Sequence, residues 1–223
     1  MLENPWADLP KESPFVLPQD KVVLDKYSPK LVGDYAIRLD TLPYPYLGSP
    51  SDATILLLAL NGGFSDQNLH YIQNDPYYVE QRRQSLIFES RYPFFYLDPV
   101  ISYTLGYKWW YRRLRYFIEK YSLETVASRF ACVQSFPYCS KRYKALPQRV
   151  PSQEYSFSLV RQAIEKGKPI VIMRSREIWF RYVPELRNYP YIELKYPRTP
   201  YLDCKHMTEV QFEDLEAALS NSD

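Results

Sequence analysis

The sequence predicts a single α/β domain built on a central four-stranded parallel sheet flanked by helices. Four short apolar runs alternate with segments of helical character, 223 residues suffice for one substantial core, and no break in composition divides the chain. Strands that alternate with helices pair in parallel through right-handed crossovers. Their carboxyl ends therefore meet at one edge of the sheet, where ligands of such folds bind.

Residues 1–52 are expected to form a proline-rich N-terminal arm that packs on a domain spanning residues 53–223. Eight prolines lie among the first 50 residues, which is too many for a long helix. The same stretch is too apolar for a free linker. We therefore expect extended chain held against the domain.

The first strand is predicted over Thr54–Leu60, a continuous apolar run typical of a strand covered on both faces. It is expected to end in a turn at Asn61-Gly62-Gly63. A helix opens at Asp75-Pro76, where proline is favoured in the first turn, and reaches about Glu89. A second helix is predicted over Trp109–Tyr121, where apolar residues recur at helical spacing.

Three further pairs of a strand and a helix follow. The strands are predicted over Phe130–Ser135, Pro169–Met173 and Tyr191–Leu194. The helices are predicted over Ser152–Lys166, over Ser175–Tyr182 and from Thr208 onward. Ser152 is expected to cap the first of these helices and Gly167 to close it, and Gln211 is placed for a capping box with Thr208.

Composition argues against several classes of protein. The apolar runs are far shorter than the roughly 20 residues of a membrane span, and the N-terminus carries no export signal, so we expect a cytoplasmic protein without a membrane partner. The cysteines Cys132, Cys139 and Cys204 match no zinc motif and are expected to be reduced. His206 beside Cys204 is read as a surface coincidence. We expect no metal and no cofactor.

Two biases in composition favour a polyanionic or stacking partner. Between residues 82 and 149 the chain has 13 Lys or Arg against 4 Asp or Glu, an excess that can bind phosphates or simply form a solvated helix face. The 22 tyrosines can provide stacking platforms for bases or pack at wet edges of the core.

Three segments converge at the predicted carboxyl edge: Asn61–Phe64, Gln134–Ser140 and Tyr196–Tyr201. The two adjacent glycines fit neither a P-loop nor a dinucleotide fingerprint. They would let a ligand approach the backbone, while the Asn61 amide could hold a water or a carbonyl; the alternative is an ordinary turn. A serine hydrolase lacks its G-x-S-x-G elbow, and Cys139 is read as a simple loop cysteine.

Together these segments resemble the uracil-DNA glycosylase superfamily, in its single-strand-selective and mismatch-specific branches. Leu58-Ala59-Leu60-Asn61-Gly62-Gly63 is similar to an apolar strand that enters a Gly-x-Asn-Pro-Gly motif, with Gly62 replacing the proline. Val133-Gln134-Ser135-Phe136-Pro137 resembles Val-His-Asn followed by proline, and Pro197-Arg198-Thr199-Pro200 resembles Pro-Arg-Asn-Pro. The order of the motifs is kept, over about residues 53–202.

The resemblance implies a three-layer sandwich and a DNA repair hydrolase that binds single- or double-stranded DNA. It would flip a uracil or modified base into a pocket and hydrolyse the N-glycosidic bond, with Asn61 positioning the attacking water. The base-binding residues would be Gly62, Gly63, Phe64, Phe94, Gln134 and Ser135. The DNA contacts would be Arg112, Arg113, Lys141, Arg142, Arg198, Thr199 and Tyr201.

The third motif departs from the family pattern. It usually begins His-Pro-Ser, and its histidine stabilises the departing base, whereas this chain has Lys195 and Tyr196 before the proline. Those two side chains are the candidates to take over the histidine's role. The iron–sulfur branches are excluded by the number and positions of the cysteines. The alternative function is a non-catalytic protein that keeps the fold and binds a nucleic acid or a protein partner; a small-molecule enzyme would lack any recognisable cofactor motif.

Overall fold

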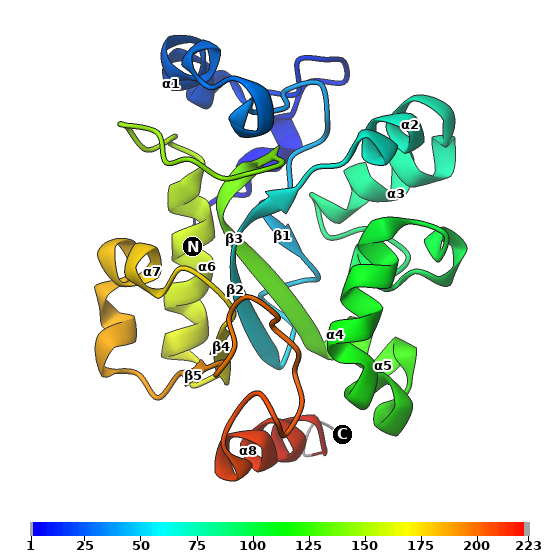
Figure 1. The fold of residues 1–223 in the computed structure, drawn as a ribbon, viewed down its shortest axis with the longest axis vertical. Coiled ribbons are helices and arrows are strands. Elements are labelled where there is room, and N and C mark those ends of the chain that lie inside the picture. Colours follow the sequence, from blue (N-terminus) through cyan, green and yellow to red (C-terminus); the bar gives the residue numbers. More distant parts are fainter. Residues whose placement is uncertain (1, 221–223) are drawn as a thin grey trace.

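A five-stranded mixed sheet forms the centre of the computed structural model, which describes residues 2–220, with strand order β1-β3-β2-β4-β5 (Figure 1). The strands are β1 (Tyr46–Leu47), β2 (Ile55–Gly63), β3 (Phe130–Ser140), β4 (Ile170–Ile172) and β5 (Ile192–Glu193). β2 pairs in parallel with β3 and β4, and β4 pairs in parallel with β5. The four predicted strands are confirmed.

The prediction of a purely parallel, four-stranded sheet is wrong, because the N-terminal arm adds β1 as an antiparallel edge strand beside β3. The backbone N–H of Tyr44 donates to the carbonyl of Pro137, and that of Gln134 donates to the carbonyl of Pro45, so the pairing includes the two arm residues that precede this strand. Prolines at 43 and 45 hide this strand in the sequence, since proline cannot donate to a ladder.

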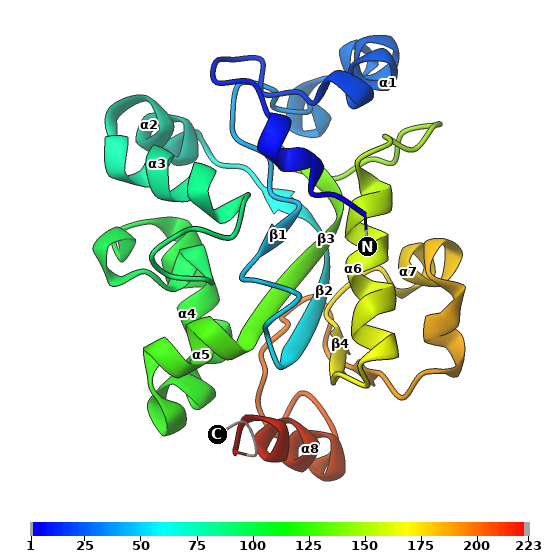
Figure 2. The ribbon, with the colours of Figure 1, turned by 180° about the vertical axis from the view of Figure 1, so that it is seen from behind.

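Helices cover both faces of the sheet, with α6 and α7 on one side and α4 and α5 on the other (Figures 1 and 2). The α-helices are α1 (Lys21–Tyr27), α2 (Asp66–Asn74), α3 (Pro76–Ser85), α4 (Leu105–Tyr121), α5 (Leu123–Arg129), α6 (Gln153–Glu165), α7 (Arg176–Tyr182) and α8 (Glu209–Ser220). The polar helix α2 and the short α5 are absent from the sequence-based prediction, and α1 shows that the expectation of a wholly extended arm is wrong. The capping box between Thr208 and Gln211 is confirmed.

Strand β2 separates two cores, which explains its continuous apolar sequence. Ile55 and Leu57 belong to the core on the α4 side, and Leu56 and Leu58 belong to the core on the α6 side; all four side chains are fully buried. Burying a leucine or isoleucine contributes roughly 1.5–3 kcal/mol, so both faces fix the position of this strand. The end of β2 is thereby a rigid platform for the residues that follow.

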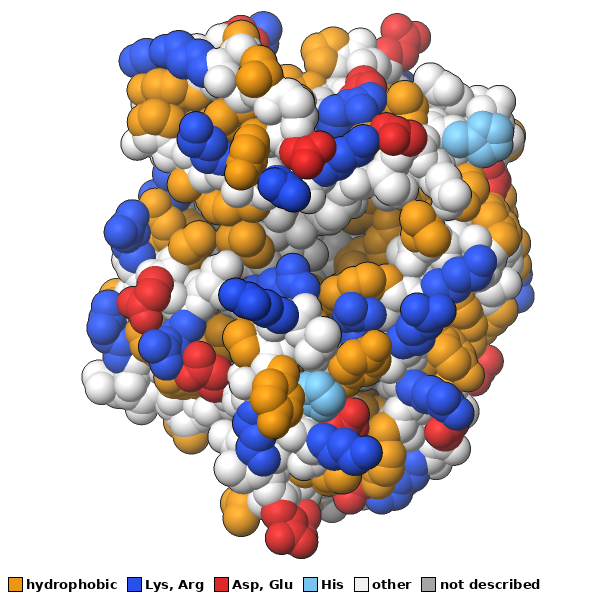
Figure 3. Space-filling view, viewed as in Figure 1, with side chains coloured by type: hydrophobic (Ala, Val, Ile, Leu, Met, Phe, Trp, Pro, Cys, Tyr) orange, Lys and Arg blue, Asp and Glu red, His pale blue; other side chains and the backbone are white. Residues whose placement is uncertain are grey.

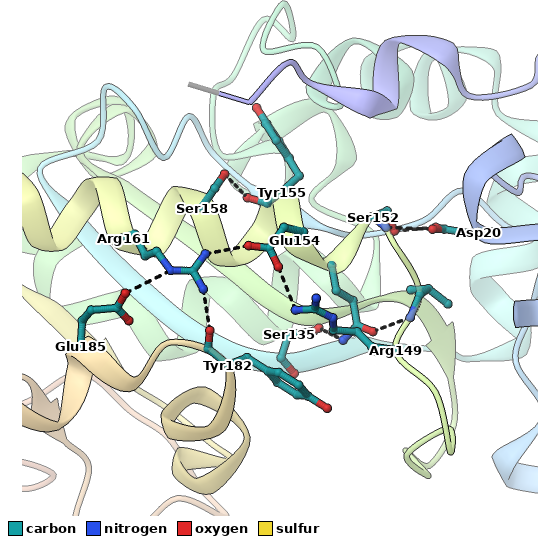
Figure 4. Close-up of polar contacts among 12 residues, drawn as sticks. Asp20, Ser135, Arg149, Ser152, Glu154, Tyr155, Ser158, Arg161, Tyr182 and Glu185 are labelled. Atoms are coloured by element: carbon teal, nitrogen blue, oxygen red, sulfur yellow. Dashed lines mark hydrogen bonds and ion pairs between the residues drawn. The ribbon is translucent and has the colours of Figure 1, made fainter.

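The arm is anchored to the rest of the domain by a buried carboxylate. Asp20 accepts hydrogen bonds from the backbone N–H of Ser152 (2.8 Å) and from its hydroxyl (2.5 Å) (Figure 4). It also accepts one from the hydroxyl of Tyr138 (2.7 Å). Burial raises the pKa of Asp20, while these hydrogen bonds act in the opposite direction. The hydroxyl of Ser152 therefore bonds to the arm and does not cap α6, contrary to the prediction.

The residues predicted to form turns after the first two strands are themselves paired in the sheet. Asn61 lies opposite Phe136 and Gly63 lies opposite Ser140, with a shift in register between them. β3 likewise continues through Phe136 and Pro137 to its end at Ser140. The pairing holds both segments at one edge, so the predicted convergence of these two segments is confirmed, although their predicted ends are wrong.

Candidate functional site

A cavity of about 570 Å³ opens at the carboxyl ends of β2 and β3. Figure 3 shows this face of the molecule hollowed near its centre, with hydrophobic side chains and Lys or Arg around the hollow. The lining comes from the arm, the end of β2, the loop before α4, α4 itself, the end of β3 and the segments after β4 and β5. The volume falls within the range of small-molecule sites, about 300–1,000 Å³.

Aromatic rings form much of the cavity wall. Tyr44 and Tyr96 lie nearly parallel, with ring centroids 5.8 Å apart and planes inclined by 10°. Gly62 packs directly on Tyr44: a Cβ at position 62 would lie 2.9 Å from a ring carbon. Gly106 packs in the same way against Tyr96. The absence of both side chains lets the backbone approach the rings, which accounts for glycine at 62 by packing and not by a turn.

Gln134 supplies a polar group to this aromatic cavity. It lies opposite Ala59 in the β2–β3 ladder and is 5% exposed. Its Oε1 is buried and has no hydrogen-bond partner. Leaving a buried acceptor unpaired costs about 1–3 kcal/mol, so the residue weakens the ligand-free fold. Because the side chain also lines the cavity, its amide is a candidate to bond a group that enters there.

Asn61 is held in one orientation beside Gln134. Its Nδ2 donates to the hydroxyl of Ser140 (3.0 Å) and to the carbonyl of Gly62 (3.3 Å). Both amide hydrogens are thereby used, and Oδ1 accepts no hydrogen bond from residues 2–220. The group that Asn61 offers to the cavity is therefore a fixed carbonyl oxygen, which can accept a hydrogen bond from a water molecule or from a ligand.

Cationic side chains surround the cavity, and they differ in whether a carboxylate pairs with them. Lys141 and Arg142 line it but pair with Asp66 (3.1 Å) and Asp34 (3.5 Å). Arg174 also lines it and donates only to backbone carbonyls of the loop after β5. Within the described chain, Arg174 forms no ion pair, which leaves its charge available to an anion.

Arg113 reinforces this charged side from α4. Its guanidinium stacks on the cavity residue Trp109, 3.5 Å from the ring centroid. Desolvation lowers its pKa to about 10, and repulsion from Arg174 and Arg112 acts in the same direction. Three arginines thus lie near one another without a carboxylate partner among residues 2–220, an arrangement suited to phosphate.

The structure brings seven of the predicted site residues to the cavity. They are Asn61, Gly62, Gly63, Phe64, Gln134, Lys141 and Arg142. Phe94 and Ser135 are instead buried away from it: Phe94 packs edge-on against Trp110, and the hydroxyl of Ser135 donates to the carbonyl of Leu60. Both side chains therefore make contacts inside the protein and do not face the cavity, contrary to the prediction.

The third predicted segment does not enter the cavity with its named side chains. The backbone N–H of Lys195 donates to the carbonyl of His206, and the ring of Tyr196 packs on His206 and is 57% exposed. The short β5 is followed by a segment that bonds toward α8 rather than toward Asn61. Also outside the lining are Arg112, Arg113, Arg198, Thr199 and Tyr201. From this loop Pro200 alone lines the cavity.

Several lining residues were not predicted from the sequence. Arg174 directly follows β4, so the rule that places ligands at the carboxyl ends of strands could have found it. Tyr44 comes from the arm, where no local pattern indicates pairing with β3. Trp109 lies on the predicted second helix, but the spacing of apolar residues did not indicate that its side chain faces a cavity.

Other chemistries find little support in the described part of the chain. Cys139 lies in β3, and burial raises the pKa of its thiol to about 12, so it is protonated at neutral pH. Residues 2–220 contain no group of three or more His, Cys, Asp or Glu side chains placed to hold a metal ion. No helix among the same residues is both long and apolar enough to cross a membrane.

Comparison with known proteins gives no assignment: no family model, no curated protein and no solved structure matches this chain.

Proposed function

We propose that this chain is a DNA-glycosylase-like protein that binds DNA, accepts one flipped uracil or modified base in the cavity and hydrolyses its N-glycosidic bond. The observation that carries the proposal is the position of Asn61 and Gln134. They come from neighbouring strands and line one aromatic cavity, and neither amide oxygen accepts a hydrogen bond from residues 2–220. An amide beside aromatic rings suits a nucleobase, which has both a polar edge and a stacking face.

The fixed carbonyl oxygen of Asn61 defines its proposed role. It accepts a hydrogen bond from a water molecule and orients that water toward the sugar carbon C1′. As the glycosidic bond breaks, its electron pair leaves with the base; the water's oxygen bonds to C1′, and one of its protons is transferred to the base. Gln134 binds the polar edge of the base.

The unpaired arginines support binding of the DNA backbone. Because Arg174 has no ion pair in the described structure, a phosphate contact there would release counterions from DNA. Arg174→Gln is expected to weaken DNA binding and to lower the slope of log K against log salt by about 1. Arg176→Gln is the matched control, because Arg176 already pairs with Glu193 at 2.8 Å. Equal effects of the two changes would argue against a phosphate at Arg174.

Base excision is tested directly with oligonucleotides that carry uracil, hypoxanthine or bulky modified pyrimidines. Abasic product is detected by alkaline cleavage of the strand. The wild type is expected to form product from at least one of them, and Asn61→Ala is expected to lose it by about 100-fold or more. Asn74→Ala, an exposed asparagine on α2, serves as the control. Absence of product from every substrate would remove the enzymatic part of the proposal.

One observation favours a second function, binding without turnover. The residues that line the cavity include no Asp, Glu, His or Cys, and Lys195 and Tyr196 lie outside it. General acid–base catalysis most often uses His, Asp or Glu. The alternative is therefore a protein that captures a nucleic acid or a partner with the same cavity. Salt-dependent DNA binding without abasic product would select it.

A further inference from the structure

Helix α3 buries a positive charge behind the cavity wall. Arg82 is fully buried, with 0% of its surface exposed. Its Nη1 donates to the hydroxyl of Ser85 (2.6 Å) and its Nη2 donates to the carbonyl of Pro43, whereas its Nε has no partner. No carboxylate pairs with it anywhere in residues 2–220. A buried arginine without a counterion is uncommon, because charges are rarely buried unless paired.

Tyr44 connects this charge to the cavity. The guanidinium carbon of Arg82 lies 3.9 Å from the centroid of the Tyr44 ring, and Tyr44 lines the cavity. The cation–π contact offsets part of the desolvation of Arg82. The positive charge is therefore separated from the cavity by one aromatic side chain and not by solvent.

A ring of hydroxyl groups extends the same wall. The hydroxyls of Tyr44, Tyr78 and Tyr96 hydrogen-bond to one another over 2.9 Å (44 to 78), 3.1 Å (78 to 96) and 2.8 Å (96 to 44). All three tyrosines are buried, and Arg82 acts to lower the pKa of Tyr78 and Tyr96 although burial raises both overall. Three polarisable O–H groups thus lie together near an uncompensated cation.

No carboxylate among residues 2–220 lines the cavity to neutralise this charge. The acids that pair with Lys141 and Arg142 are not part of its lining. A charge in a low-dielectric interior acts over a longer distance than a surface charge and is little screened by salt. The field of Arg82 consequently favours negative charge on a ligand beside Tyr44 and Tyr96.

We propose that Arg82 makes the cavity selective for a heterocycle that carries, or develops, negative charge at the Tyr44–Tyr96 wall. Arg82 acts through Tyr44, so it is a specificity-determining and positioning residue that does not touch the ligand. Where the proposed glycosylase function holds, the same charge stabilises the base as it leaves with the electron pair of the glycosidic bond. The preference for an anion in binding does not depend on that function.

The test compares two ligands of nearly the same shape and different charge, orotate and its uncharged carboxamide, by isothermal titration calorimetry. The wild type is expected to bind orotate at least about tenfold more tightly, and to keep that preference at about 1 M salt, where the exposed rim arginines are screened. At that salt concentration Arg82→Met is expected to bind both ligands equally, whereas Arg82→Lys keeps the charge and most of the preference.

Arg83→Met is the matched control. The neighbouring Arg83 also donates to carbonyls of the arm, at Pro10 and Lys11, but it packs on Phe15 outside the cavity. It is expected to keep the full preference for orotate, which separates the field of Arg82 from a general loosening of the arm.

Three results would overturn the inference: equal binding of the two ligands by the wild type, loss of the preference at high salt, or full preference in a folded Arg82→Met protein. The first two need no variant, so the test remains decisive if Arg82→Met does not fold. Preference for orotate without excision of any base would refute the enzymatic proposal alone. Base excision with equal binding of both ligands would refute the role of Arg82 alone.

Discussion

Replacing Gln134 by methionine is expected to stabilise the protein and to abolish ligand binding at the same time. Methionine has nearly the same length and shape as glutamine but no amide. Because Oε1 of Gln134 is buried and unpaired, the change removes a penalty of about 1–3 kcal/mol from the folded state. For a chain of this size, each kcal/mol raises Tm by about 2–4 °C. Thermal denaturation followed by circular dichroism measures the shift.

Gln153→Met provides the matched control, since the amide of Gln153 is paired at both ends. Its Nε2 donates to the carbonyl of Ser135 (2.6 Å), and its Oε1 accepts from the backbone N–H of Val150 (3.0 Å). This change leaves two buried backbone groups unpaired and is expected to destabilise the fold by about 1–3 kcal/mol. If Gln134→Met lowered Tm as much as Gln153→Met does, Gln134 would have a structural role and our interpretation of the cavity would be wrong.

Two further changes test the packing around the site and the anchoring of the arm. Gly62→Ala would place a methyl group 2.9 Å from a ring carbon of Tyr44, so we expect the free energy of unfolding in urea to fall by about 1–3 kcal/mol. Gly63→Ala should be close to neutral, because no atom lies within 4 Å of the added methyl group. Equal effects of the two changes would contradict this. The raised pKa of Asp20 means that its contribution to the free energy of unfolding is fully present below the unfolded pKa, about 3.9, and is lost as pH rises through the folded pKa. Asp20→Asn should therefore flatten the dependence of stability on pH just above that value, and an unchanged dependence would contradict this.

The elements with strong local patterns could be predicted from the sequence. The run at Ile55–Leu58 is apolar because both of its faces are buried, and that is the pattern a central strand shows. Gly167 ends α6 with φ of +66°, the conformation that makes glycine a common terminator of helices. In these places local sequence and tertiary structure require the same residue.

The parts that sequence reasoning missed depend on contacts between distant segments. β1 exists because the arm pairs with β3, almost 90 residues later, and its two residues have no periodicity of their own. Asn61-Gly62-Gly63 looks like a turn, yet pairing with β3 holds it in the sheet, and Gly62 is required by the ring of Tyr44. The buried position of Arg82 also has no local pattern, because Pro43 and Tyr44 of the arm create its environment.

Only the part of the candidate site that follows from the topology of the sheet could be predicted from the sequence. Asn61 and Gln134 lie in the neighbouring strands β2 and β3, and the topology of a parallel sheet is enough to bring them to one cavity. The position of the segment after β5 depends on how α8 packs, which the sequence does not reveal. Lys195 and Tyr196 are consequently placed beside His206, and Arg174 takes the position at the cavity that the third motif was expected to fill.

The central claim, that this cavity holds a flipped base between Asn61 and Gln134, is tested most directly by a crystal structure with bound DNA. The DNA should carry a 2′-fluorinated deoxyuridine, whose glycosidic bond resists hydrolysis. We predict that the base lies in the cavity, with its polar edge hydrogen-bonded to the amide of Gln134 and with C1′ facing the carbonyl oxygen of Asn61. A base that remains stacked in the DNA, or that binds elsewhere while Gln134 stays unpaired, would contradict the account.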